Sequence, residues 1–353
     1  MIYKFFLIFL LSLTFQVHAS KLNETNAFNF TEDQIQLAIE IIQKLESNHL
    51  VKKDYKEIKN EAFEVFIERL DPNKNIYTDE EVLKVLNNIK TDSDIRKDFQ
   101  IAYDLFNRYI DRYQERYEVQ IEFLKEIDED DLQSDRKIER LLSEASRQIS
   151  LDALRSLWKD LSTNEVIQLM LAGNSLDESV EKTIKRMNNQ LNYFQQTRGE
   201  DVFNIFINSI ASIYGPHTAY MSPKNSEDFD INMSLSLEGI GALLTSDGLY
   251  TSISSLVPGG PAEITESLKP EDKIIGVGQD AEGEIVDVIG WRIDDVVDLI
   301  RGPKGSIVRL EIIPSTALSD TETKQVEIIR NVVKLEDQAA EKKVLSLIRN
   351  NKE

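Results

Sequence analysis

The sequence contains no cysteine, and histidine occurs only three times in 353 residues. A chain without thiols forms no disulfide, so its stability must come from packed cores. The lack of cysteine and the scarcity of histidine exclude a His/Cys metal cluster, and no EF-hand loop is present. We therefore expect no metal and no cofactor. A length of 353 residues suggests two or three domains at ~150 residues each, and 41% hydrophobic residues are enough for packed cores.

Basic residues are too few to balance the acidic ones. Lys and Arg number 41 against 62 Asp and Glu, which gives a formal net charge of −21. This balance argues against nucleic acid and anionic membrane surfaces as partners, because both are negatively charged themselves. High solubility is the simplest consequence of such a charge.

Only one long apolar run occurs, at residues 5–17, after Lys4. The small-residue pattern that ends at Ala19 predicts a secretory signal peptide over residues 1–19. The run is shorter than the ~20 residues of a membrane-spanning helix, although an uncleaved anchor is the alternative. No cysteine follows for lipid attachment. We expect a periplasmic protein whose only membrane contact is through its export signal.

Residues 20–230 are predicted to form an all-α domain, because apolar residues recur there at helical spacing. Glycine and proline are absent from residues 94–127, which predicts one helix of ~50 Å with a tyrosine stripe as its packing face. Residues 213–230 are rich in turn formers and are interpreted as the exit from this domain, in which His217 would make a structural hydrogen bond. Capping boxes predict helix starts at Thr31, Thr78, Ser162 and Ser175.

The hydrophobic period changes after residue 230, and short strands with two short helices predict a compact α+β domain over residues 231–331. The fold class is therefore multidomain, α followed by α+β. The predicted strands are residues 239–244, 249–255, 273–278, 285–289, 307–313 and 324–329, and the predicted helices are residues 261–268 and 294–300.

A Gly-Ile-Gly turn at residues 239–241 is the most informative motif of this second domain. A strand, not a helix, is predicted after it, with no third glycine and no P-loop lysine, which argues against a nucleotide. Glycines let successive N–H groups converge into a nest that holds a carboxylate. The strand after the turn could pair with an extended peptide, and a helix across from it could form the other wall. The pattern favours capture of a peptide C-terminus.

Several segments together resemble the tail-specific, or carboxy-terminal processing, serine protease family. "SLEGIGALL", "VPGGPAEITESLKPEDKIIGVGQ" and "DVIGWRIDDVVDLIRGPKGSIVRLEI" are similar to its PDZ domain, a small barrel-like sheet with two helices. "LDPNKNIYTDEEV" and "EDVFNIFINSIASIYGPHTAYMSPKNSEDF" resemble its N-terminal helical domain. The resemblance implies that C-terminal tails of protein substrates are the partners. The peptide-binding residues it implies are Gly239, Ile240 and Gly241 in the carboxylate loop, Ala242, Leu243 and Leu244 in the pairing strand, and Val296, Val297 and Ile300 on the groove helix.

The family's chemistry implies a Ser nucleophile and a neutral Lys base in a domain that follows the PDZ domain. No such pair is recognised here; Ser346 is interpreted as a surface residue, and no catalytic residue is assigned. Residues 332–353 are interpreted as the start of a truncated peptidase domain. We expect the substrate-recognition portion of an exported endopeptidase, inactive alone. The alternative is a stand-alone periplasmic peptide-binding or adaptor protein, and a separate partner of the helical domain stays possible.

Overall fold

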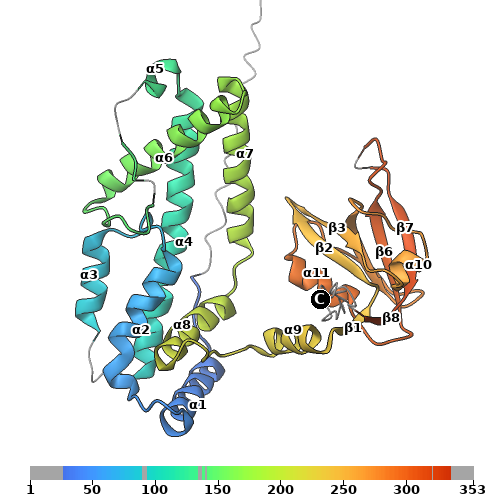
Figure 1. Cartoon of the computed structure of the whole chain (residues 1–353), viewed down its shortest axis with the longest axis horizontal. Helices are drawn as coiled ribbons and strands as arrows, with labels where there is room; N and C mark the ends of the chain where they lie inside the picture. The colour runs from blue at the N-terminus through green and yellow to red at the C-terminus, as the bar shows by residue number, and fades with distance from the viewer. Residues whose placement is uncertain (1–26, 90–93, 134–136, 140, 320, 335–353) are drawn as a thin grey trace, which may run out of the picture.

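The computed structural model describes residues 27–89, 94–133, 137–139, 141–319 and 321–334. The proposed signal peptide, Ser346 and almost all of residues 332–353 lie outside the described residues. Figure 1 shows two lobes, one of helices and one mainly of strands, joined by helix α9 (Pro223–Ser234). We call residues 27–214 the helical lobe and residues 236–334 the β lobe. This arrangement confirms the α and α+β fold class.

The helical lobe is organised around one long helix, α4, which runs from Ile95 to Glu126. Its first half lies in a large buried cluster with α1, α2 and α8, and its second half packs with α6 and α7 in a smaller cluster. The predicted tyrosine stripe is confirmed as a packing face, since Tyr109 and Tyr113 both contact the ring of Phe194 on α7. The other helices are α1 (Glu32–Asn48), α2 (Tyr55–Leu70), α3 (Asp79–Asn88), α5 (Glu129–Leu132), α6 (Leu151–Leu171), α7 (Leu176–Gln195) and α8 (Gly199–Tyr214).

Three of the predicted helix starts are confirmed, and one is wrong. Capping boxes at Thr31, Thr78 and Ser175 begin α1, α3 and α7. Ser162 instead lies inside α6, where it is buried and accepts a hydrogen bond of 2.8 Å from the Gln120 amide. The start of α6 is capped by Ser150.

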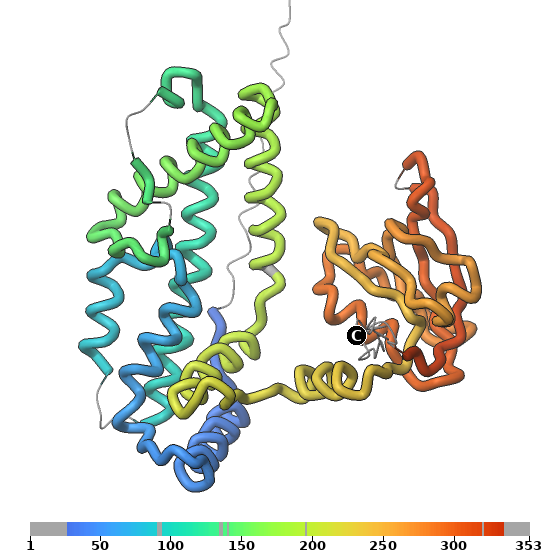
Figure 2. The backbone as a smooth tube through the Cα atoms, in the orientation of Figure 1, coloured from blue at the N-terminus to red at the C-terminus, as the bar shows by residue number. Residues whose placement is uncertain are grey.

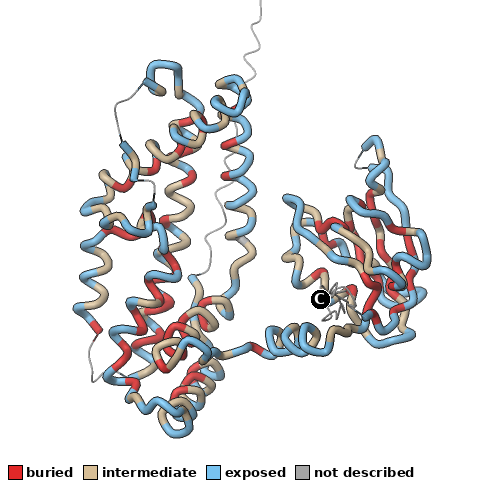
Figure 3. Tube along the Cα trace, viewed as in Figure 1, coloured by how far each residue is buried: buried red, intermediate tan, exposed pale blue. Residues whose placement is uncertain are grey.

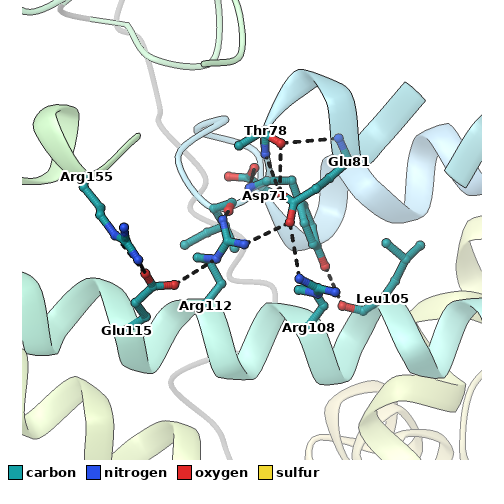
Figure 4. Close-up of polar contacts among 10 residues, drawn as sticks. Asp71, Thr78, Glu81, Leu105, Arg108, Arg112, Glu115 and Arg155 are labelled. Atoms are coloured by element: carbon teal, nitrogen blue, oxygen red, sulfur yellow. Dashed lines mark hydrogen bonds and ion pairs between the residues drawn. The ribbon is translucent and has the colours of Figure 1, made fainter. Parts of the chain in front are cut away.

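A charged network fastens α3 to α4 (Figure 4). Glu81 completes the Thr78 capping box and also accepts bonds from Arg112 at 2.9 Å and Arg108 at 3.5 Å. Arg112 is largely buried and continues the network to Glu115, whose other partner is Arg155 on α6. Each buried charge therefore has an opposite charge beside it, as a buried ion requires.

The β lobe contains an antiparallel sheet in the order β2-β3-β4-β6-β7, with β5 paired to β4. β1 and β8 form a separate two-stranded pair. The helices α10 (Pro261–Ile264) and α11 (Ile293–Ile300) complete the lobe. Most of its buried apolar side chains form one aliphatic cluster, and Figure 3 marks the buried residues in red along the backbone. The strands are β1 (Ser236–Gly239), β2 (Ala242–Asp247), β3 (Tyr250–Leu256), β4 (Lys273–Gln279), β5 (Ile285–Asp287), β6 (Ile307–Ile313), β7 (Lys324–Ile329) and β8 (Asn331–Lys334).

The structure corrects three expectations around this lobe. The predicted strand 239–244 is broken at Gly241, whose φ of +74° sends its two parts into different sheets. The predicted helix 261–268 ends at Ile264, and Glu266 at φ +53° turns the chain away. The predicted strand 285–289 ends at Asp287. Residues 213–230 do leave the helical lobe, and α9 begins within them at Pro223 with Ser222 as its cap (Figure 2).

The histidine expected to brace the exit turn is not the one that does so. His217 is exposed, and within the described residues it makes no hydrogen bond, whereas His49 Nε2 lies 2.9 Å from the Thr218 hydroxyl. Among the described helices, none is long and apolar enough to span a membrane.

Candidate peptide-binding groove

The strand β2 lies at one edge of the five-strand path and pairs with β3 alone among the described strands. Its other edge therefore has backbone N–H and C=O groups without a strand partner, which is the surface that an extended peptide can join. The predicted pairing residues Ala242, Leu243 and Leu244 form its first half. Leu243 is 50% exposed, whereas Ala242 and Leu244 are half-buried against the core.

The carbonyl groups of the turn before β2 accept hydrogen bonds from other backbone N–H groups of the β lobe. Ile240 O accepts the Ala262 N–H and Gly241 O accepts the Val257 N–H, both at 2.8 Å. Gly241 and Val257 therefore form a hydrogen-bonded pair next to the Ala242–Leu256 pair. In an antiparallel ladder such pairs alternate with pairs that are not hydrogen-bonded, so the Ala242 N–H points away from β3. A donor is thus directed to the open edge where the strand begins.

Gly241 is required at this turn for two reasons. Its φ of +74° is disfavoured for any residue with a Cβ. A Cβ placed there would also lie 3.1 Å from Gly260 Cα and 3.4 Å from the Val333 methyl groups. The side chain of Ile240 is buried in the β-lobe core and anchors the turn, while Gly239 is buried with an ordinary φ.

Helix α11 supplies the predicted groove-helix residues, but they do not share one environment. Val296 and Ile300 belong to the buried core cluster, whereas Val297 is half-buried and outside it. Ile293 lies four residues before Val297 on the same flank of the helix and is also half-buried. The sequence interpretation of this helix as the opposite wall of the groove includes Ile293, and its i, i+4 spacing to Val297 places both on that wall.

Two arginines near the end of α11 were not predicted from the sequence. The buried Arg330 donates to Ile300 O at 2.8 Å and to Leu299 O at 2.9 Å, which ties the last turn of α11 to the sheet. Burial lowers the pKa of Arg330. Arg301 is the residue after α11 and lies close to the Gly-Ile-Gly turn. A Cβ on Gly239 would lie 3.9 Å from Arg301 Cα. No local pattern distinguishes these arginines from surface ones, since both roles depend on contacts across the fold.

The arrangement is suited to holding an extended polypeptide chain. In the part of the chain that the structure describes, no group of three or more His, Cys, Asp or Glu side chains could hold a metal ion. The open edge of β2, the Gly241 turn at its start and the flank of α11 are the features available to a ligand.

Comparison with known proteins gives matches over most of the chain. The family model described as "Tail specific protease N-terminal domain" matches residues 41–224, and the PDZ domain model matches residues 228–313. The tail-specific protease of Haemophilus influenzae is 36% identical over 314 residues, covering 85% of this chain and 44% of the relative. The carboxy-terminal processing protease CtpA of Bacillus subtilis is 32% identical over 141 residues, covering 40% of this chain and 28% of the relative.

A solved structure also matches part of the chain. It is the PDZ domain of a carboxy-terminal protease from Vibrio cholerae in complex with peptide, 50% identical, with a TM-score of 0.27. The match covers 29% of this chain and 100% of that one. The chain spans less than half the length of the two curated relatives it matches here.

Proposed function

Because this chain belongs to the tail-specific protease family, we propose that it is the substrate-recognition portion of an exported serine-type endopeptidase. The β lobe binds C-terminal tails of polypeptides between β2 and α11. The observation that supports this most directly is the open edge of β2, which begins at a glycine turn that directs an N–H outward. The proposed domains are a signal peptide over residues 1–19, a helical domain over 20–230, a PDZ domain over 231–331 and the start of a peptidase domain over 332–353.

The ligand lies as an added strand beside β2, with its terminal carboxylate at residues 239–241. Its last side chain is apolar, because Val297 and Ile293 on α11 and Leu244 on β2 offer aliphatic surface. Main-chain hydrogen bonds give affinity, and the apolar pocket gives specificity. One strand and one pocket suggest micromolar affinity, ~8 kcal/mol.

A pair of peptides tests the carboxylate site. A fluorescent peptide with an apolar C-terminal residue is titrated with the purified chain, once with a free carboxylate and once amidated. We expect the free acid to bind at least tenfold more tightly, because the amide removes the charge that the N–H groups hold. Equal affinities would refute carboxylate recognition.

A glycine pair tests the location of the site. Gly241→Ala should abolish measurable binding, since the left-handed turn and the contact with Gly260 both oppose a Cβ. Gly248→Ala is the control, because Gly248 also has a positive φ of +65° but no atom lies within 4 Å of its Cβ position. Binding retained by Gly241→Ala, with a circular dichroism spectrum like that of the control, would place the site elsewhere.

The stand-alone adaptor is distinguished by the DNA that follows codon 353. A reading frame that continues into a domain with a Ser/Lys pair supports the recognition portion of a protease. An unrelated gene at that position supports an adaptor.

A further inference from the structure

The outward side of the groove helix α11 is strongly acidic. Asp294, Asp295 and Asp298 are three of its eight residues, and Val296 and Ile300 anchor the opposite side in the core. Eight residues are fewer than the ~12–15 that an isolated helix needs to be even marginally stable in water. The position of α11 therefore depends on what contacts it from both sides.

Those acidic residues are met by cations from outside the β lobe. Arg198, at the α7–α8 junction, donates from both terminal nitrogens to the two Asp295 oxygens, the longer bond being 3.1 Å. Lys224 on α9 lies 2.6 Å from an Asp298 oxygen and 3.1 Å from the Asp294 carbonyl oxygen. Arg198 within the helical lobe and Lys224 on α9 thus both bind the acidic side of the groove helix.

In one further ion pair the charges are reversed, with the cation in the β lobe and the carboxylate in the helical lobe. Arg292, the residue before α11, lies 2.8 Å from a carboxylate oxygen of Asp201 on α8. Burial would lower the pKa of Arg292, but its hydrogen bond to Asp201 and the nearby acidic residues outweigh burial and raise it. The Gln196 amide adds a bond of 3.0 Å to the Gly290 carbonyl oxygen.

Polar contacts join α11 and the residues before it to the α7–α8 junction and α8, and two cavities lie beside these contacts. A cavity of about 570 Å³ lies on one side, lined by Trp291, Arg198 and Asp298 among others, and one of about 300 Å³ lies beside Phe194. Gln196, Thr197 and Arg292 line both cavities. The ion pairs beside these cavities are partly exposed, and salt weakens such exposed pairs.

We propose that the helical lobe and α9 position the groove helix for its ligand through the pairs Arg198–Asp295, Arg292–Asp201 and Lys224–Asp298. These pairs hold α11 at a fixed distance from β2. Their six side chains are positioning residues, since none lies in the groove itself. The inference rests on the proposed function, because it concerns the affinity of that same groove.

A charge swap tests the proposal on the whole chain, with the free-carboxylate peptide as probe. Arg198→Glu and Asp295→Arg each place like charges together, and each should weaken binding by about fivefold. The double variant Arg198→Glu/Asp295→Arg restores an opposite pair and should bind within about twofold of the wild type. Binding by the wild type should also weaken as salt is raised, more than binding by the single variants.

The matched control is an ion pair between α6 and α7. Arg186 pairs with Glu165 at 2.9 Å, and its side chain is 59% exposed, against 57% for Arg198. Arg186→Glu makes the same change in net charge far from α11, so it should leave the peptide affinity unchanged. A loss equal to that of Arg198→Glu would show a general charge effect and overturn the positioning role.

A second readout reports the attachment without any peptide. Because the chain has no cysteine, Asn188→Cys on α7 and Glu327→Cys on β7 introduce the only two thiols for spin labels. The label distance should be narrowly distributed in the parent and broad in Arg198→Glu, and narrow again in the charge-swapped double variant.

The outcomes separate this inference from the proposed function. If the wild type binds the free-carboxylate peptide and the swaps change neither affinity nor distance, the positioning role is wrong and the proposed function stands. If the wild type binds neither form of the peptide, the proposed function fails and the positioning role fails with it, whatever the label distances show.

Discussion

The two lobes build their cores from different kinds of side chain. The large cluster of the helical lobe is rich in rings, whereas the β-lobe cluster contains only Ile, Val, Leu and Ala. Between residues 236 and 334 the sequence has just two aromatic residues, Tyr250 and Trp291. Large rings fill the wide spaces between helices, and branched aliphatic side chains suit a pleated surface. The buried rings of this large cluster are Tyr55, Phe63, Phe66, Tyr77, Phe99, Tyr103, Phe106, Phe203, Phe206 and Tyr214.

This division also places one tryptophan in each lobe. Trp158 is fully buried in the helical lobe, and Trp291 is 42% exposed in the β lobe. Replacing either one with Phe leaves a fluorescence signal from the other lobe alone. The stability of the two cores can therefore be compared within one chain.

Phe206→Ala should produce the largest difference between the lobes. Phe206 is fully buried, with ring centroids of Phe63, Phe66 and Phe99 at 4.9 to 5.2 Å. Truncation should cost ~3–5 kcal/mol of unfolding free energy, because it leaves a cavity among rigid rings. The unfolding transition reported by Trp158 fluorescence (the Trp158 transition) should move to a lower urea concentration. The one reported by Trp291 fluorescence (the Trp291 transition) should not move.

The control for that experiment is Leu310→Ala, which truncates a fully buried side chain on β6. It should shift the Trp291 transition and leave that of Trp158 in place, with a cost of ~2–5 kcal/mol. If either variant moved both transitions together, the lobes would unfold as one cooperative unit.

Lys59→Met should have the next largest effect, again in the helical lobe. Lys59 and Asp98 are both buried, with 3.4 Å between Nζ and Oδ2, and the Tyr55 hydroxyl donates to the same oxygen at 3.1 Å. Removing the lysine charge from beside a buried carboxylate should cost ~3 kcal/mol in urea unfolding. The double variant Lys59→Met/Asp98→Leu should recover most of this loss. No recovery would mean that the lysine stabilises the lobe by packing.

Alkaline pH should weaken the helical lobe gradually. Burial, with smaller contributions from Glu46 and Asp54, raises the pKa of Tyr214 to about 12, and burial also raises the pKa of Tyr55 and Tyr77. Unfolded tyrosine titrates near ~10, so the unfolded chain loses these protons first. The contribution of protonated Tyr214 to the folding free energy of the helical lobe is therefore complete below pH ~10 and is lost as pH rises through about 12.

The measurement is urea unfolding of the two tryptophan variants at increasing pH. The Trp158 transition should fall more steeply above pH ~10 than the Trp291 transition, since the β lobe has a single tyrosine. Parallel losses in both lobes would contradict a role for the buried hydroxyls.

Sequence reasoning succeeded where structure is decided by neighbouring residues. Capping boxes at Thr31, Thr78 and Ser175 and the strand over residues 307–313 depend on local pattern alone, and all are confirmed. It failed at Ser162, which has the residues of a cap but is held inside α6 by Gln120 on another helix. β1 was missed because its partner β8 lies almost a hundred residues away.

The candidate groove could be predicted only in part for the same reason. The Gly-Ile-Gly turn was visible in the sequence, and its positive φ at Gly241 has a local cause. The division of α11 into buried Val296 and half-buried Val297 depends on how the helix is rotated against the sheet. Arg292 and Arg330 act through contacts made after folding, which no local spacing reveals.

The open edge of β2 has a consequence for the behaviour of the protein in solution. Backbone groups that accept a peptide can also accept the same strand of another copy, which is how sheet proteins aggregate. The register shift between Leu243 and Leu244 bends this edge, and a net charge of −21 keeps copies apart. Concentrated protein in high salt loses the second protection and keeps only the first. Self-association through β2 should therefore compete with peptide binding under those conditions.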